Sequence, residues 1–139
     1  MRPLVAASVL LPIALAAFAD EPFALSGRHG LAPFRFEAGN AGVEPIACGA
    51  SVAHWFSLEL GRADPGRAVA TELWSEPASG AVFAINASGD RMAVEALWCG
   101  FEGRAWETAA HIALKRRAET PAPDIRVICR AAGSRLSCF

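Results

Sequence analysis

The sequence predicts an all-β protein, a small antiparallel β-sandwich or barrel held together by two disulfides. Segments in which apolar and polar residues alternate recur about every 12 to 15 residues, a spacing typical of all-β domains. Turn-forming triplets separate these segments, among them Asp64-Pro65-Gly66 and Ser88-Gly89-Asp90. The chain also contains four cysteines, an even number that suits a small disulfide-bonded domain.

Residues 1–19 have the features of a cleavable secretory signal peptide. Arg2 supplies the positive charge, an uncharged apolar run follows, and Ala17-Phe18-Ala19 is a small-x-small triplet of the kind that signal peptidase accepts. The run is about 15 residues long, whereas a helix needs about 20 to span a bilayer. The alternative is a buried N-terminal helix of the domain, but Pro12 within the run argues for cleavage.

Residues 20–139 are then expected to form a single secreted, β-rich domain. The full chain has 13 basic and 14 acidic residues and no basic block, which disfavours binding to nucleic acid or to an anionic membrane. Tyrosine is absent, alanine is abundant, and arginine far outnumbers lysine, a bias typical of a GC-rich bacterium. Together with the signal peptide, this predicts a periplasmic or secreted bacterial protein.

The first half of the domain contains two predicted strands. Glycine and proline interrupt residues 20–45, and only 31–37 is expected to be a short strand there. The clearest alternation runs over 46–60, where Val52, Phe56 and their even-numbered neighbours are mostly apolar. This pattern predicts one long half-buried strand, with a bulge near Gly49.

Three more strands are expected at 68–74, 81–86 and 91–99. The segment 104–119 is ambiguous. As a strand it places Trp106 on an apolar face and His111 on the opposite polar face; as a helix it forms a stripe of Trp106, alanines and Leu114. We expect the strand, and a helix would change the class to α+β. On strand 91–99, one face is expected to carry Met92, Val94, Ala96 and Trp98.

The cysteines are expected to pair as Cys129–Cys138 and Cys48–Cys99. Alternating residues on either side of Gly133-Ser134 predict a β-hairpin with a type II′ turn, and its register places Cys129 opposite Cys138 at a non-hydrogen-bonded position. The second pair follows by elimination. Zinc is disfavoured because even the nearest two cysteines have eight residues between them, and the thiol-oxidoreductase motif Cys-x-x-Cys is absent from the sequence. We therefore expect no cofactor and no metal.

A short echo relates two of these cysteines. Each of Cys48-Gly49 and Cys99-Gly100 is followed by a tryptophan seven positions after the cysteine, Trp55 and Trp106. The echo suggests two related strands that each bury a tryptophan, although the residues in between do not match and coincidence explains the echo equally well.

The sequence contains no recognisable catalytic, metal or nucleotide motif, and we predict no catalytic residue. His54 lies on the apolar face of the clearest strand and is expected to be a hydrogen-bonded core residue. Trp55 and Trp74 fall on the faces opposite the predicted core, so they are candidates for an exposed partner patch. The alternative is that covering segments bury both tryptophans.

Two classes of function remain. In the first, the protein is a non-enzymatic binding module, such as an inhibitor or accessory subunit, whose partner is a protein or small ligand outside the cytoplasm. It would act through an edge strand or through the patch of Trp55 and Trp74. In the second, it is a small secreted enzyme whose site is assembled from dispersed residues such as His54 or His111.

Overall fold

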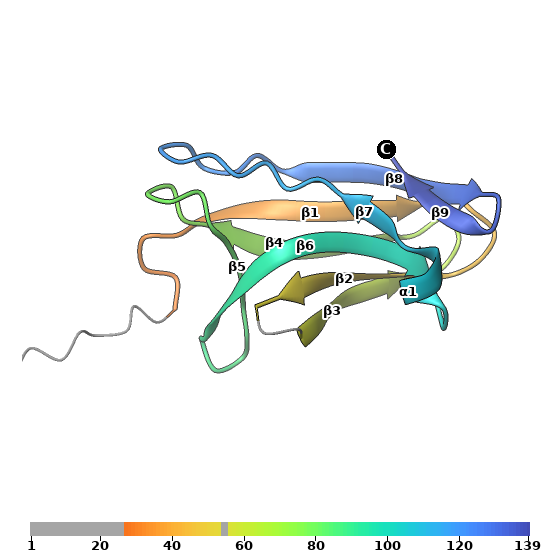
Figure 1. Cartoon of the computed structure of the whole chain (residues 1–139), viewed down its shortest axis with the longest axis horizontal. Helices are drawn as coiled ribbons and strands as arrows, with labels where there is room; N and C mark the ends of the chain where they lie inside the picture. Colours follow the sequence, from red (N-terminus) through yellow and green to blue (C-terminus); the bar gives the residue numbers. More distant parts are fainter. Residues whose placement is uncertain (1–26, 54–55) are drawn as a thin grey trace, which may run out of the picture.

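The computed structural model describes residues 27–53 and 56–139, which form a nearly all-β domain (Figure 1). The predicted signal peptide, His54 and Trp55 lie outside the described residues. The strands are β1 (Ala32–Asn40), β2 (Ile46–Val52), β3 (Phe56–Ala63), β4 (Ala68–Ser75), β5 (Val82–Ile85), β6 (Arg91–Phe101), β7 (Ala110–Ile112), β8 (Ile125–Ala132) and β9 (Arg135–Cys138), and the helix α1 (Ala105–Thr108) follows β6. The predicted all-β class is confirmed.

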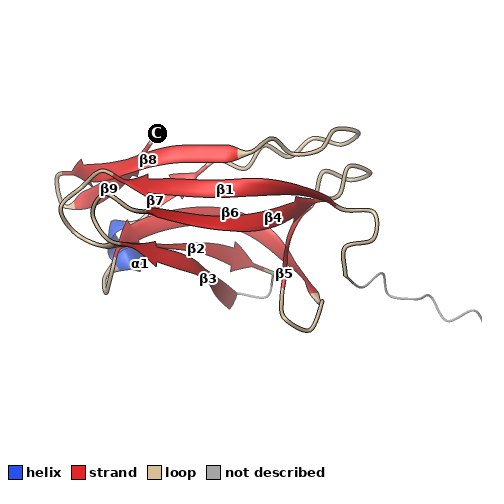
Figure 2. Ribbon diagram, turned by 180° about the vertical axis from the view of Figure 1, so that it is seen from behind, coloured by secondary structure: helices blue, strands red, loops and turns tan. Residues whose placement is uncertain are grey.

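The strands form one continuous sheet that folds into two layers (Figure 2). Their order is β3-β2-β6-β5-β4-β1-β8-β9, and β7 also pairs with β6. One layer contains β3, β2, β6 and β7; the other contains β5, β4, β1, β8 and β9. The layers are joined where residues 91–93 of β6 pair with β5. The sheet is mixed, because β1 and β8 run parallel while the other described pairs are antiparallel.

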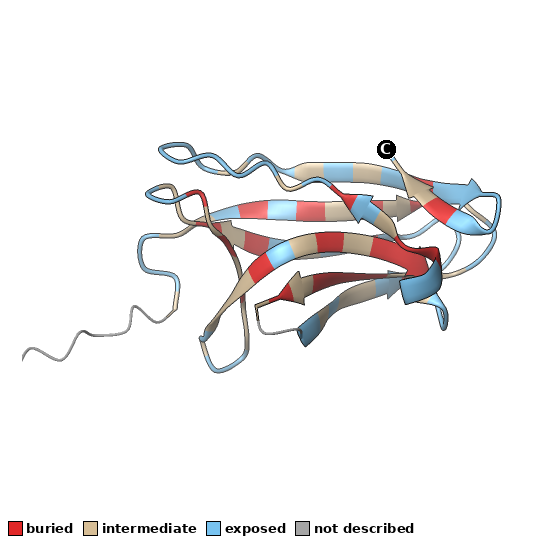
Figure 3. Ribbon diagram, viewed as in Figure 1, coloured by how far each residue is buried: buried red, intermediate tan, exposed pale blue. Residues whose placement is uncertain are grey.

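The hydrophobic core fills the space between the two layers (Figure 3). Each layer contributes alternate residues of its strands, as expected for packed sheets. From the β1 layer come Phe36 and Leu73, both fully buried, and from the β2 layer come Ile46 and Leu97. No helix among the described residues is long and apolar enough to cross a membrane.

The predicted single strand over 46–60 is wrong, because this segment is a hairpin. Val52 of β2 pairs with Phe56 of β3, so the chain reverses between these two residues. Apolar and polar residues keep alternating across the reversal, so the sequence of the two strands resembles that of a single strand. The predicted bulge near Gly49 is confirmed: the β2–β3 register shifts between Cys48 and Gly49, leaving Leu60 of β3 without a partner.

The predicted shared face of β6 is wrong from Ala96 onward. Ser51 pairs with Ala96 and Val52 pairs with Val94, so Glu95 is an extra residue in β6. This bulge reverses the alternation. Val94, Leu97 and Cys99 are therefore buried in the core, and Trp98 lies on the outer face of its layer, across Gly49.

Neither interpretation of 104–119 describes the whole segment. It contains the four-residue helix α1 and then the three-residue strand β7, and residues 113–124 continue without regular structure to β8. The last stretch carries the chain from β7 in one layer to β8 in the other. Such a crossing permits the parallel pairing of β8 with β1, since a parallel partner cannot be reached through a tight turn.

Both predicted disulfides are confirmed. Cys48–Cys99 joins β2 to β6, and Cys129–Cys138 joins the two strands of the β8–β9 hairpin. Ile128 and Phe139 exchange both backbone hydrogen bonds, so the neighbouring pair Cys129 and Cys138 is non-hydrogen-bonded, as predicted. Gly133 has φ of +64°, which suits the first central residue of the predicted type II′ turn.

Candidate functional site

Three connections and α1 gather at one end of the sandwich, on the right in Figure 1. These are the β1–β2 loop (41–45), the β3–β4 turn (64–67), the segment 102–108 that includes α1, and the β8–β9 turn (133–134). We call this surface the α1 end. It is the candidate site because two neighbouring segments there each expose a large apolar side chain.

The exposed apolar residues of the α1 end are Trp106 and Val43. Trp106 of α1 is 76% exposed and Val43 of the β1–β2 loop is 91% exposed. The two segments lie side by side, since the backbone N–H of Glu102 donates to the carbonyl oxygen of Pro45 over 3.0 Å. An exposed tryptophan offers a large rigid surface for a partner at low entropic cost.

The position of α1 depends on Gly100 and Thr108. Gly100 faces the backbone of Ala105 so closely that a Cβ at Gly100 would overlap it. The buried Thr108 hydroxyl accepts from the N–H of Phe101 and donates to the carbonyl of Arg104, each over 2.9 Å. The helix is thus fixed against the end of β6, and its tryptophan points away from the core.

Ion pairs link the segments that carry the two apolar side chains. Arg104 bonds both carboxylate oxygens of Glu44 at 3.1 Å, which ties the β1–β2 loop to the start of α1. Arg62 of β3 binds Glu102 at 2.7 and 2.9 Å and also contacts Asp64 at 2.9 Å. Hydrogen bonding from Arg62 lowers the pKa of the Glu102 carboxyl below its ordinary value, and the same hydrogen bond raises the pKa of Arg62.

Asn40 connects the loops beneath this surface. It is only 3% exposed, and its side-chain amide donates to the carbonyls of Glu44 at 2.8 Å and Ala63 at 3.0 Å. Its side-chain oxygen accepts from the N–H of Gly42 at 3.0 Å. One buried side chain therefore holds the β1–β2 loop against the end of β3.

The predicted partner patch is only half described. Trp74 of β4 is half-buried on the outer face of the β1 layer, and the guanidinium of Arg28 lies over its ring, 4.9 Å from the centroid. Trp55 lies outside the described residues. A joint patch of Trp55 and Trp74 stays a prediction.

Of the two histidines in the enzyme hypothesis, His54 lies outside the described residues and only His111 has a described position. His111 of β7 is exposed and lines a groove of about 380 Å³ between β7 and β8, to which Asp124 also contributes. Asp124 accepts a hydrogen bond from the backbone N–H of Arg35 at 2.7 Å. Among the described residues, no carboxylate forms an ion pair with His111.

Three cysteine sulfurs lie close enough together to resemble a metal site. The sulfurs of Cys99, Cys129 and Cys138 are within 4.8 Å of one another. Each is already bonded in a disulfide, and zinc in proteins binds thiolates. The cluster is therefore a contact between two disulfides.

No protein-family model, curated protein or solved structure matches this chain. The candidate site is therefore identified from the structure of this chain alone.

The sequence analysis missed Trp106 as a surface residue. Both interpretations of 104–119 placed it on an apolar face, and the echo with Trp55 suggested that it was buried. The structure corrects this point: the echo's two glycines lie on the same outer face, but Trp106 is exposed. A local signal was present in Glu102-Gly103-Arg104, a polar turn directly before α1, where Gly103 has φ of +79°.

Proposed function

We propose that the protein is a non-enzymatic binding module that acts outside the cytoplasm, as an inhibitor or accessory subunit, and that the α1 end contacts a partner protein. The observation that carries the proposal is the exposure of Trp106, which is 76% exposed on a helix fixed rigidly to the end of β6. Tryptophan is among the residues most enriched at the energetic centres of protein interfaces.

The surroundings of Trp106 support a protein partner. Val43 adds apolar area, and the Glu44–Arg104 and Arg62–Glu102 ion pairs supply a polar rim. The ion pairs and Asn40 also hold the loops in one arrangement before any partner binds. Preorganisation of this kind lowers the entropic cost of association.

The location is supported by two observations. Residues 1–19 have the pattern of a secretory signal, and the two disulfides are compatible with an oxidising compartment outside the cytoplasm. Together they favour the periplasm or the extracellular space.

The proposal is tested by substituting the two exposed residues. The mature protein is used to capture partners from a periplasmic and culture extract of its source, and the dissociation constant of the captured protein is measured by calorimetry. We expect Trp106→Ala to weaken binding at least about 30-fold, which corresponds to the loss of about 2 kcal/mol typical of an interface hot spot. Val43→Asp should weaken binding as well.

The matched control is Trp74→Ala, which removes a tryptophan from the outer face of the β1 layer and is expected to leave the dissociation constant unchanged. Unchanged binding by both Trp106→Ala and Val43→Asp would exclude the α1 end as the contact surface. A loss of binding confined to Trp74→Ala would show instead that the partner contacts the outer face of the β1 layer.

A further inference from the structure

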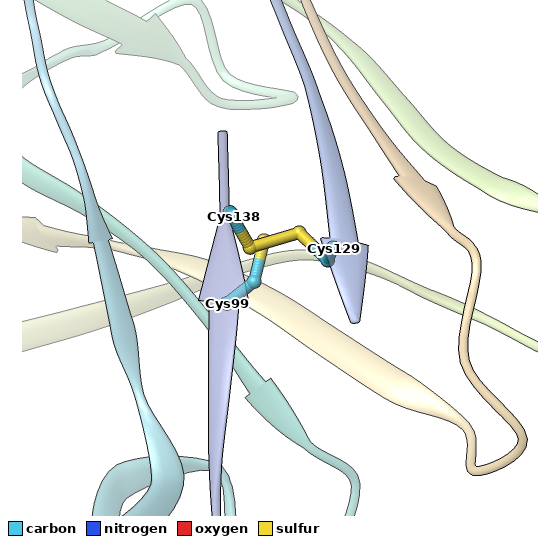
Figure 4. A group of neighbouring side chains, drawn as sticks. All are labelled: Cys99, Cys129 and Cys138. Atoms are coloured by element: carbon cyan, nitrogen blue, oxygen red, sulfur yellow. A yellow bond between two sulfur atoms is a disulfide. The ribbon is translucent and has the colours of Figure 1, made fainter. Parts of the chain in front are cut away.

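The sulfur of Cys99 lies beside the Cys129–Cys138 disulfide (Figure 4). Each disulfide joins strands within one layer, β2 to β6 in one and β8 to β9 in the other. Yet the sulfurs of Cys99, Cys129 and Cys138 all lie within 4.8 Å of one another. A sulfur of one layer therefore lies within 4.8 Å of the sulfurs of the other layer's disulfide.

The four cysteine residues differ in their exposure to solvent. Cys48, Cys99 and Cys129 are at most 1% exposed, whereas Cys138 is half-buried and lines the groove between β7 and β8. Among the charged residues of this groove are Lys115 and Arg126, both exposed, with Asp124 as the acidic group. Because the attacking species in disulfide exchange is an anionic thiolate, the cations favour its approach to Cys138.

We propose that Cys138 is the entry site for thiol–disulfide exchange by a dithiol, and that reduction is passed to the second disulfide to leave a Cys99–Cys129 bond between the layers. The substrate class is a small dithiol or the dithiol of a thiol oxidoreductase. This site is separate from the α1 end and does not depend on its proposed role.

The exchange proceeds in three steps. A thiolate of the dithiol attacks the sulfur of Cys138 and displaces the Cys129 thiolate. The second thiol of the reagent then attacks the mixed disulfide, releases Cys138 and leaves as a cyclic or protein disulfide. The Cys129 thiolate attacks the sulfur of Cys99 and displaces Cys48. The two protons of the dithiol end on Cys138 and Cys48, so one disulfide has been reduced in total.

The proximity of Cys129 to the second disulfide makes the last step possible. The sulfur of Cys99 lies within 4.8 Å of the Cys129 sulfur, and the step exchanges one buried thiolate, Cys129, for another, Cys48. Attack on Cys99 restores a bonded sulfur at both positions. The product exchanges two bonds within layers for one bond between layers, so the sandwich stays cross-linked when half its disulfides are reduced.

The test uses the unaltered oxidised protein. It is treated briefly with dithiothreitol under native conditions and quenched with acid, and free thiols are labelled at acid pH in denaturant before mass mapping. We expect the species with one disulfide to contain Cys99–Cys129, with Cys48 and Cys138 labelled. A species that keeps Cys48–Cys99 and carries labels on Cys129 and Cys138 would overturn the relay. A Cys99–Cys138 bond would overturn Cys138 as the entry site.

A variant provides a second measurement. In the double variant Cys129→Ser, Cys138→Ser the relay is removed, and we expect the buried Cys48–Cys99 disulfide to be reduced at least about 10-fold more slowly than in the native protein. Near-UV circular dichroism establishes that the variant is folded. Equal reduction rates in a folded variant would contradict the relay, and the mapping of the native protein decides the matter should the variant not fold.

Discussion

Gly49 is a residue at which a single methyl group has a large predicted effect. It lies on the outer face of β2, and the indole of Trp98 from β6 rests directly on its Cα, so that any Cβ would overlap the ring. The contact is between side chain and backbone in neighbouring strands. The bulge at Glu95 turns Trp98 to this outer face, and its buried indole nitrogen has no hydrogen-bond partner within the described structure.

We expect Gly49→Ala to lower the free energy of unfolding by about 1–3 kcal/mol, because the new Cβ must displace a packed ring. Urea denaturation measures the change. The control is the double variant with Trp98→Ala, in which the methyl group has room. Once Trp98 is absent, the added cost of Gly49→Ala should nearly vanish. Equal costs in both backgrounds would show that the indole does not restrict this position.

At the scale of elements, the features marked by a signal in the nearby sequence were predicted correctly, and the features without such a signal were missed. The β8–β9 hairpin, its register and its disulfide were correct because only eight residues lie between Cys129 and Cys138, and the turn-forming residues are among them. The β2–β3 reversal was missed because residues 53–55 contain no glycine, proline or asparagine. The bulge at Glu95 was missed because it is defined by the partner strand, whose register the sequence of β6 does not contain.

Asn40 joins elements that are distant in sequence, and its removal should loosen the loops of the α1 end. We expect Asn40→Ala to destabilise the protein by about 2 kcal/mol, because the buried carbonyl oxygen of Ala63 and the part-buried one of Glu44 lose their donor. Chemical denaturation gives the value. Asn40→Asp is the informative comparison: it keeps the acceptor for Gly42 but turns a carboxylate toward the same carbonyls, so at neutral pH it should be at least as destabilising as alanine. A carboxylate variant as stable as the native protein would show that the amide donations contribute little.

At the scale of the whole molecule, the candidate site could not be read from the sequence. The α1 end is assembled from loops that follow β1, β3, β6 and β8, and only the folding of the sheet into two layers brings them together. The predicted fold class and disulfides were confirmed, since they depend on periodicity and cysteine spacing. The exposure of Trp106 depends instead on where α1 packs against the end of β6, and the alternation of apolar and polar residues does not predict that position.

The contact between the two disulfides predicts that their contributions to stability are coupled. The chain-entropy model assigns about 4 kcal/mol to a loop the size of that closed by Cys48–Cys99 and about 3 kcal/mol to one the size of the hairpin loop. Replacing either pair with alanine also abolishes the contact between the disulfides across the core. That contact is lost in both single-disulfide variants but only once when both disulfides are removed. We therefore expect the fourfold alanine variant to lose less stability than the sum of the two pairs, by about 0.5–3 kcal/mol. Urea denaturation in trimethylamine N-oxide, an osmolyte that favours the folded state, measures all four proteins under one condition. Strict additivity would mean that the two layers are stabilised independently, despite the contact of their sulfurs.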